Sequence, residues 1–297
     1  MTTSRLETKA LRSRGYELEP LLPERWPIAL EMLQRSYPLT PTAWWNAGYT
    51  RLMAVPPNDD HSPIGVLMHG PRGIAGVSLL FGSRRGLGNT VQNHVNASSW
   101  AIEPTDRMQA LWMAKQTLSD PKTVYTALTP IPQALRILQR LGFRAVSSQR
   151  VLVITPLQVR HKAPMVRILD TNETLQAFKD SLLLRALHDH ARLGCLVCAI
   201  ALPDRLVPLV MRTRRQSRLI PLAEVVYSPS VADITAAIGP LSRFLLRQGV
   251  ALLQFEAHED AQIEVSCTRL FSRRFASGPY RPEGIDHLYS ELVYLQN

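Results

Sequence analysis

The chain has 297 residues, which is longer than an average single domain and fits two domains of about 150 residues each. Hydrophobic residues make up 45% of it, enough for ordinary cores, and no apolar run approaches the roughly 18–20 residues that a membrane span needs. The N-terminal residues 1–20 carry charge but no apolar signal core, so we expect a cytoplasmic protein.

The net charge is +10, from 34 Lys and Arg against 24 Asp and Glu. Such an excess fits nucleic acids, anionic membranes or anionic small ligands. The arginines are scattered, and their densest run, residues 211–218, lies between two apolar stretches, which is typical of a solvated hairpin loop. No zinc-finger spacing, RRM signature or basic zipper is present, so we do not expect a nucleic-acid partner.

Hydrophobic periodicity and turn residues predict the elements of the first half. Gly142, directly after the last predicted helix of this half, is expected to cap its C-terminus. In chain order the predicted elements are a strand at 16–21, a helix at 23–37, a hairpin of strands at 64–70 and 73–82, a loop at 83–94, a strand at 95–102, a helix at 106–118, a strand at 123–128, a helix at 131–141 and strands at 143–146 and 148–155.

A second cycle of elements follows Pro164. Asp170, with Glu173 three residues later, is expected to cap the first helix of this half. The predicted elements are a strand at 165–169, a helix at 172–187, strands at 195–202, 206–212 and 219–227, a helix at 231–248, a strand at 250–257, a basic segment at 269–282 and a final strand at 287–295.

The two halves share this order of elements, which is a weak internal repeat. We therefore predict an α/β (α+β) class with two units, in residues 1–160 and 161–297. Each unit is expected to hold a mixed, mostly antiparallel sheet flanked by helices.

Two short motifs in the second half contain possible metal ligands. Cys195 and Cys198 form a CxxC inside a continuously apolar run, and one such pair is half a zinc site at most, so we interpret both as core residues. His188, Asp189 and His190 end a helical pattern, where surface or capping roles are expected rather than ligation. We expect no bound metal.

The stretch "SSWAIEPTDRMQAL" (98–111), followed by "VYTALTPIPQALRILQRLGFRAV" (124–146), resembles the GNAT acyl-CoA N-acyltransferases. In that family a strand ending in Val/Ile-x-Pro leads into an Arg- and Gly-rich loop that opens a helix, and a later small helix ends in Leu-Gly-Phe. Here Ile102-Glu103-Pro104 matches the strand end, Arg107 the loop and Leu141-Gly142-Phe143 the later signature. The resemblance covers most of residues 15–155.

The resemblance implies an acyl-CoA-dependent N-acyltransferase, most simply an N-acetyltransferase, with acetyl-CoA or another acyl-CoA as co-substrate. The acceptor would be a small-molecule amine or a protein. Free backbone groups of a splayed strand would pair with the pantetheine amides, at Ser99, Trp100, Ala101 and Ile102. Backbone N–H groups at the start of the next helix would hold the pyrophosphate, at Arg107, Met108, Gln109, Ala110 and Leu111.

Acyl transfer to an amine needs a group that takes the amine proton. His94 lies upstream on the predicted strand and is of a residue type that titrates near neutral pH, although a structural histidine is the open alternative. Glu103 adjoins the predicted loop, and its alternative is a solvent-facing carboxylate. These two residues are the candidate bases.

The sequence departs from the family pattern at the predicted loop and at a later helix. Met108, Ala110 and Trp112 stand where the family prefers glycine, and Leu138 stands where the family often has the tyrosine that protonates the leaving thiolate. The second half has no Arg/Gly loop at residues 231–234 and is expected to be a degenerate GNAT-like unit. The alternative hypothesis is therefore a non-catalytic GNAT-like binding or scaffold protein.

Overall fold

The computed structural model describes residues 12–13, 15–56, 63–87, 90–163, 165–216, 219–258, 261, 263, 265–280 and 284–295. The chain forms two compact units. Unit 1 comprises Met1–Arg84, Val91–Arg144 and Phe275–Tyr280, and unit 2 comprises Arg85–Thr90, Ala145–Arg274 and Arg281–Asn297. Separate domains that meet at residue 160 stay a prediction.

The strands of unit 1 follow the order β1-β2-β3-β4-β5-β6, and the end of β13 adds to the free edge of β6. The pairs from β1 to β4 are antiparallel, whereas β5 and β6 are parallel. The elements are β1 (Arg12–Ser13), β2 (Tyr16–Pro20), η1 (Pro23–Arg25), α1 (Trp26–Ser36), α2 (Thr42–Ala54), β3 (Gly65–Gly70), β4 (Gly73–Leu87), β5 (Thr90–Ile102), η2 (Pro104–Gln109), α3 (Ala110–Thr117), β6 (Thr123–Ala127) and α4 (Pro132–Arg140).

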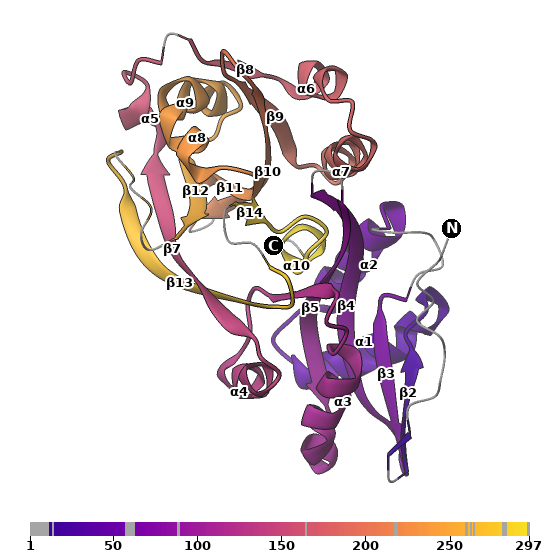
Figure 1. Ribbon diagram of the computed structural model, residues 1–297. Helices are drawn as coiled ribbons and strands as arrows, with labels where there is room; N and C mark the ends of the chain where they lie inside the picture. The colour runs from indigo at the N-terminus through magenta and orange to yellow at the C-terminus, as the bar shows by residue number, and fades with distance from the viewer. Residues whose placement is uncertain are drawn as a thin grey trace. The chain divides into compact units, whose positions relative to one another are not determined.

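Helices cover both faces of the sheet of unit 1 (Figure 1). On one face α3 buries Met113 against Leu18 and Met68 of the sheet. On the other face lie α1 and α2. The buried residues of α1 are Trp26, Ala29, Met32 and Leu33. Gly142 ends α4 with φ +84°, and the Phe143 N–H donates to the Leu138 carbonyl at 3.0 Å, so the predicted glycine cap is confirmed.

The strands of unit 2 follow the order β13-β7-β12-β11-β10-β9-β8, with β14 paired to β11. Helix α9 packs on the apolar face of this sheet, which includes Phe255, Val225 and Met211. The elements are β7 (Arg144–Ile154), α5 (Thr155–Gln158), β8 (Arg167–Leu169), α6 (Thr171–Ala177), α7 (Ser181–Arg192), β9 (Leu196–Ala201), β10 (Leu206–Gln216), β11 (Ile220–Ser228), α8 (Val231–Ala236), α9 (Ile238–Arg247), β12 (Leu252–Ala257), β13 (Thr268–Ser277), β14 (Ile285–Asp286) and α10 (Glu291–Tyr294).

The predicted fold class, mixed sheets flanked by helices, is confirmed in both units. The hairpin of β3 and β4 is confirmed, and so is the capping box of Asp170 and Glu173. Cys195 and Cys198 are core residues, as predicted, and burial raises the pKa of each thiol to about 12. Among the described helices, none has both the length and the apolar character for crossing a bilayer.

Several local predictions are wrong. The helix expected at 231–248 is two helices, α8 and α9, and the strands expected at 143–146 and 148–155 are the single strand β7. The loop expected at 83–94 is mostly strand, because β4 runs to Leu87 and β5 starts at Thr90, with residues 88–89 outside the described part. The helix expected at 172–187 is two helices, because Asp180 caps a new helix start. The final strand expected at 287–295 is a turn and helix α10, because Tyr289 has φ +49°. The helix expected to start at Asp106 starts at Ala110, after η2.

Candidate functional site

Two parallel strands part in unit 1. The ladder between β5 and β6 runs from Asn93↔Thr123 to Asn96↔Thr126. Beyond that point β5 continues to Ile102, whereas β6 ends at Ala127. Within the described residues, β5 has no further pairing with β6. One edge of β5 at residues 97–102 is thus left without a strand partner on that side.

The alternation of side chains along β5 shifts near the point of parting. Ala97 and Trp100 both pack against the cluster that α3 and α4 form with Phe143. In a regular strand, side chains three residues apart face opposite sides of the sheet. The shift by one residue indicates an irregularity of the bulge type between Ala97 and Trp100, which bends a strand away from its neighbour.

Tyr37 occupies part of the unpaired edge. The Glu103 N–H donates to the Ala75 carbonyl of β4 at 2.9 Å. Backbone groups of successive strand residues point to opposite edges of the strand, so those of Trp100, three residues earlier, point away from β4 and toward the gap. There the Tyr37 hydroxyl donates to the Trp100 carbonyl oxygen at 2.9 Å and accepts the Trp100 N–H at 3.3 Å. Tyr37 directly follows α1, and its ring packs on Trp45 with centroids 5.8 Å apart.

The turn after β5 is a closed 3-10 helix, η2, and not an open loop. Pro104 starts it, a position that suits proline because no N–H is needed there. The Asp106 N–H donates to the Glu103 carbonyl at 2.9 Å, and the Ala110 N–H donates to the Arg107 carbonyl. In such a helix each N–H bonds three residues back. In this conformation, backbone N–H groups that were predicted to bind a pyrophosphate, such as that of Ala110, are already hydrogen-bonded within the turn.

Asp106 fastens η2 to the sheet. The Tyr16 hydroxyl donates to Asp106 Oδ1 at 2.5 Å, the Thr105 hydroxyl donates to Oδ2 at 2.8 Å and Arg72 pairs with Oδ2 at 3.3 Å. The Asp106 side chain is buried. The hydrogen bond from Tyr16, followed by that from Thr105, lowers the pKa of Asp106 below its ordinary value. Sequence reasoning missed this residue, because two of its partners, Tyr16 and Arg72, lie far away in the chain.

We expect Asp106→Asn to lower the melting temperature by about 2–4 °C at neutral pH, because an amide accepts fewer of these hydrogen bonds. The lowered pKa means that the stabilisation is present above the unfolded-state pKa and is lost as the pH falls through the folded-state pKa. The difference in melting temperature between the variant and the wild-type chain should therefore become smaller in acid. Calorimetric scans at a series of pH values measure this difference. A difference that grows in acid would contradict the lowered pKa of Asp106.

The large apolar side chains at the expected glycine positions do not fill the gap beside β5. Met108 is 90% exposed, and Leu111 is also exposed. Trp112 packs against the cluster around Met68 and Met113 on the sheet. Arg107 is exposed on η2. The predicted cofactor-binding residues from 99 to 111 therefore lie on adjoining elements, β5, η2 and α3, and their roles stay predictions.

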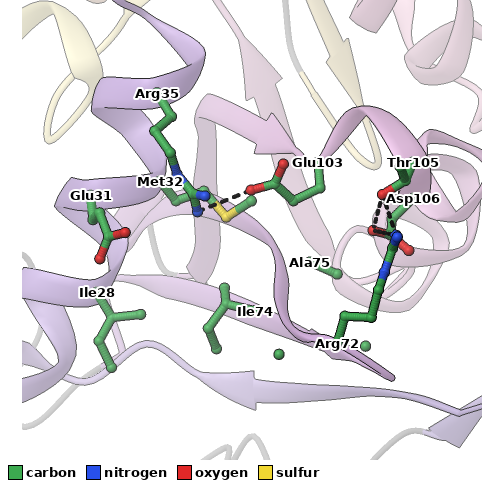
Figure 2. A pocket seen from close by; sticks show the side chains of 12 residues that line it. Ile28, Glu31, Met32, Arg35, Arg72, Ile74, Ala75, Glu103, Thr105 and Asp106 are labelled. Carbon is green, nitrogen blue, oxygen red and sulfur yellow. Dashed lines mark hydrogen bonds and ion pairs between the residues drawn. The ribbon is translucent and has the colours of Figure 1, made fainter.

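Glu103 belongs to a hollow on the α1 side of the sheet. Its carboxylate pairs with Arg35 at 3.0 Å, and the hollow has a volume of about 450 Å³. Figure 2 shows Glu31 and Arg35 of α1 on one side of it and Arg72 with Asp106 on the other.

His94 lies at the other end of β5. It is buried, its Nε2 lies 3.2 Å from the Gln92 amide oxygen, and it stands opposite Val124 of β6. At about 3.3 Å per residue, His94 and Glu103 are roughly 30 Å apart along the chain. The structure does not bring the two candidate bases together.

Leu138, at the position of the family's tyrosine, is buried in the cluster around Phe143 and offers no proton. In the described part of the chain, no three His, Cys, Asp or Glu side chains gather as a metal site.

Solved structures share this fold. A GCN5-related N-acetyltransferase from Anabaena variabilis ATCC 29413 superposes with a TM-score of 0.56 at 10% identity, over 88% of this chain and 72% of that chain. A putative acetyltransferase from Pyrococcus horikoshii gives 0.55 at 11% identity, over 97% and 98%. A GCN5-related N-acetyltransferase from Kribbella flavida gives 0.52 at 10%, over 88% and 70%. No protein-family model and no curated protein matches the sequence.

Proposed function

From the GNAT fold of this chain we propose that it is an acyl-CoA-dependent N-acyltransferase with its site in unit 1. The observation that supports the proposal is the parting of β5 and β6 after Asn96↔Thr126. A pantetheine arm carries amide donors and acceptors, and it can add to a free strand edge as an extended peptide does. The edge at residues 97–102 is such a surface.

The Trp100 backbone would be the central contact of the arm. Its N–H and carbonyl face the gap and are held now by one side-chain hydroxyl, that of Tyr37. A pantetheine amide supplies the same donor and acceptor, so it would replace the Tyr37 hydroxyl there. The arm would thus compete with Tyr37 for Trp100.

The diphosphate end would lie over η2 and the start of α3. Arg107 is exposed there and can make charge-assisted hydrogen bonds to phosphate oxygens. Asp106 holds the turn in place from below. Direct use of the backbone N–H groups would need η2 to open.

For the acceptor amine we assign the base to His94 and not to Glu103. An arm that runs from η2 along the free edge would bring the thioester toward Ala97, three residues from His94 on the same strand. Glu103 is at the opposite end and is already paired with Arg35. His94 would take the amine proton as the nitrogen attacks the acyl carbon, and the sulfur would leave with the electron pair of the broken C–S bond.

Calorimetric titration with acetyl-CoA and longer acyl-CoAs tests the proposal. We expect saturable binding, and Arg107→Ala should weaken it about 5–10-fold, because one charge-assisted contact of about 1–1.5 kcal/mol is lost at an exposed position. Lys115→Ala is the matched control, since Lys115 is an exposed cation of α3 and should leave affinity unchanged. Absence of binding at millimolar ligand would exclude the enzyme.

The second candidate is a non-catalytic GNAT-like binding or scaffold protein. It is favoured by the bond between Tyr37 and Trp100, by the closed turn η2 and by Leu138 at the tyrosine position. On this hypothesis Arg107→Ala leaves function untouched, whereas a change at buried Phe143 disrupts the fold. The same titrations decide between the two, because a scaffold shows no saturable acyl-CoA binding.

A further inference from the structure

Unit 2 contains the same parting of parallel strands as unit 1. β11 and β12 pair in parallel from Leu222↔Leu252 to Glu224↔Gln254. Beyond that point β11 continues to Ser228, and Pro229 follows it before helix α8. In unit 1, Pro104 follows the end of β5 and starts η2. This parting, called the second slot below, corresponds to the one that we propose for the pantetheine arm in unit 1.

This second slot is filled by the chain itself. β14 pairs with β11 through Tyr227↔Asp286 and Ser228↔Ile285, and the next N–H, that of His287, donates to the Val226 carbonyl at 2.7 Å. The other edge of β11 is taken by β10, so β14 lies on the side that faces β12.

A side-chain contact ties the same segment to β12. His287 Nε2 lies 3.1 Å from Glu256 Oε2 of β12, and both residues are buried. The segment is therefore bonded to both of the parted strands, through its backbone on one side and a side chain on the other.

Gly284 lets the segment pass over the end of β11. A Cβ at this position would lie 2.6 Å from the Ser228 carbonyl oxygen and 3.0 Å from that of Pro229. Such distances are closer than van der Waals contact, so only glycine fits without a shift. Ser228 and Pro229 correspond to the end of β5 and to Pro104, the first residue of η2, in unit 1. The segment thus covers the place of a phosphate turn as well as the strand edge.

The residues after β14 fix the segment in place. The Tyr289 N–H donates to His190 Nε2 at 3.1 Å, and its hydroxyl donates to Asp189 at 2.6 Å. Arg212 donates to the Leu292 carbonyl at 2.7 Å, and Tyr294 is fully buried. In unit 1, by contrast, one tyrosine hydroxyl stands in the corresponding gap. The occupant of unit 2 is therefore a structural part of its core.

We propose that residues 284–295, the plug segment, take the place of acyl-CoA in unit 2, so that the chain offers one cofactor slot instead of two. The expected number of bound acyl-CoA molecules rests on the proposed function of unit 1. The closure of unit 2 does not, because it follows from the pairing of β14 with β11.

Binding stoichiometry tests the proposal. Calorimetry with acetyl-CoA should give one site per wild-type chain, and Gly284→Leu, whose side chain pushes the plug segment off β11, should give two. Gly86→Leu is the matched control in unit 2, since an added Cβ there meets nothing closer than 3.8 Å. No site in the wild type and one in Gly284→Leu would refute the function of unit 1 and support the plug. Two sites in the wild-type chain would overturn the proposal that the plug segment closes unit 2.

Hydrogen exchange on the wild-type chain keeps the test decisive where Gly284→Leu does not fold. Amides of residues 284–288 should exchange at the same rate with and without saturating acetyl-CoA. Faster exchange there on addition of acetyl-CoA would mean that the ligand displaces the plug segment, and the proposal would fall. A folded Gly284→Leu with fast exchange at 285–288 and no added site would also overturn it.

Discussion

We expect Tyr37→Phe to bind acetyl-CoA about 5–10-fold more tightly than the wild-type chain. The Tyr37 hydroxyl holds both the N–H and the carbonyl of Trp100. A ligand that pairs with this strand edge must first break that contact, which is worth about 1–1.5 kcal/mol for an ordinary hydrogen-bonded group. Removal of the hydroxyl frees the edge, and each 1.4 kcal/mol is a tenfold change in affinity.

Tyr49→Phe is the matched control for this variant. The Tyr49 hydroxyl also donates to a backbone carbonyl at 2.9 Å, but this carbonyl belongs to Pro23 and not to a residue of β5. Tyr49→Phe should lower the stability of the fold by a similar amount and leave the affinity for acetyl-CoA unchanged. Isothermal titration of the three proteins makes the comparison. Weaker binding by Tyr37→Phe would mean that the hydroxyl contacts the ligand and does not compete with it.

Acid should destabilise unit 2 through His190 before it affects most carboxylates. The ring is completely buried; Nδ1 lies 2.7 Å from the Ala186 carbonyl, which only accepts, and Nε2 faces the Tyr289 N–H, which only donates. His190 is therefore held neutral, with its proton on Nδ1. Burial, aided by the Arg85 charge, lowers its pKa from 6.5 to about 4, although the Ala186 hydrogen bond opposes the shift.

The direction of the pH dependence follows from the number of protons that the folded and the unfolded chain bind. Between pH 6.5 and about 4 the unfolded chain binds a proton that the folded chain excludes, so stability falls as the pH falls. At 1.36 kcal/mol per pKa unit the loss reaches about 3 kcal/mol near pH 4 and then stops growing. Above pH 6.5 this residue contributes no pH dependence.

Urea unfolding at pH 7, 6, 5 and 4.5 measures the loss. His190→Gln, whose amide can donate to Ala186 and accept from Tyr289, should remove most of the pH dependence in this window. His188→Gln is the matched control, because His188 is exposed on the same helix and should leave the slope unchanged. An equal slope in wild type and His190→Gln would show that His190 is protonated in the folded chain.

The sequence was sufficient for the fold and for much of the local structure. The match at 102–107 and 141–143 led to the GNAT fold, which the solved structures confirm. Local rules placed the turn of the β3–β4 hairpin and the caps at Gly142 and Asp170, because each depends only on neighbouring residues.

The long-range contacts of the site could not be predicted in this way. Tyr37 meets Trp100 across 63 residues and Tyr16 meets Asp106 across 90, and nothing in their own neighbourhoods marks the pairing. Met108 stands at an expected glycine position, yet η2 turns its side chain to solvent. The geometry of the candidate site therefore depends on contacts that periodicity does not encode.

The same limit explains the error at residues 188–190, which were expected at the surface or as caps. Asp189 and His190 are buried instead, because Tyr289, about a hundred residues further along the chain, docks on both. The misassigned strand at 287–295 has the same origin, since its apolar alternation reflects burial of a turn and of α10.

Strand β13 gives the chain an order of assembly. Its last residues, Phe275–Ser277, pair with Tyr125–Ala127 of β6 and supply the neighbour on that edge of unit 1. About 150 residues separate the paired segments, and such distant contacts slow folding. During synthesis the edge of β6 therefore stays without this neighbour until nearly all of unit 2 has left the ribosome. An open strand edge is a site for aggregation, and the growing chain exposes this one until residues 275–277 have been made.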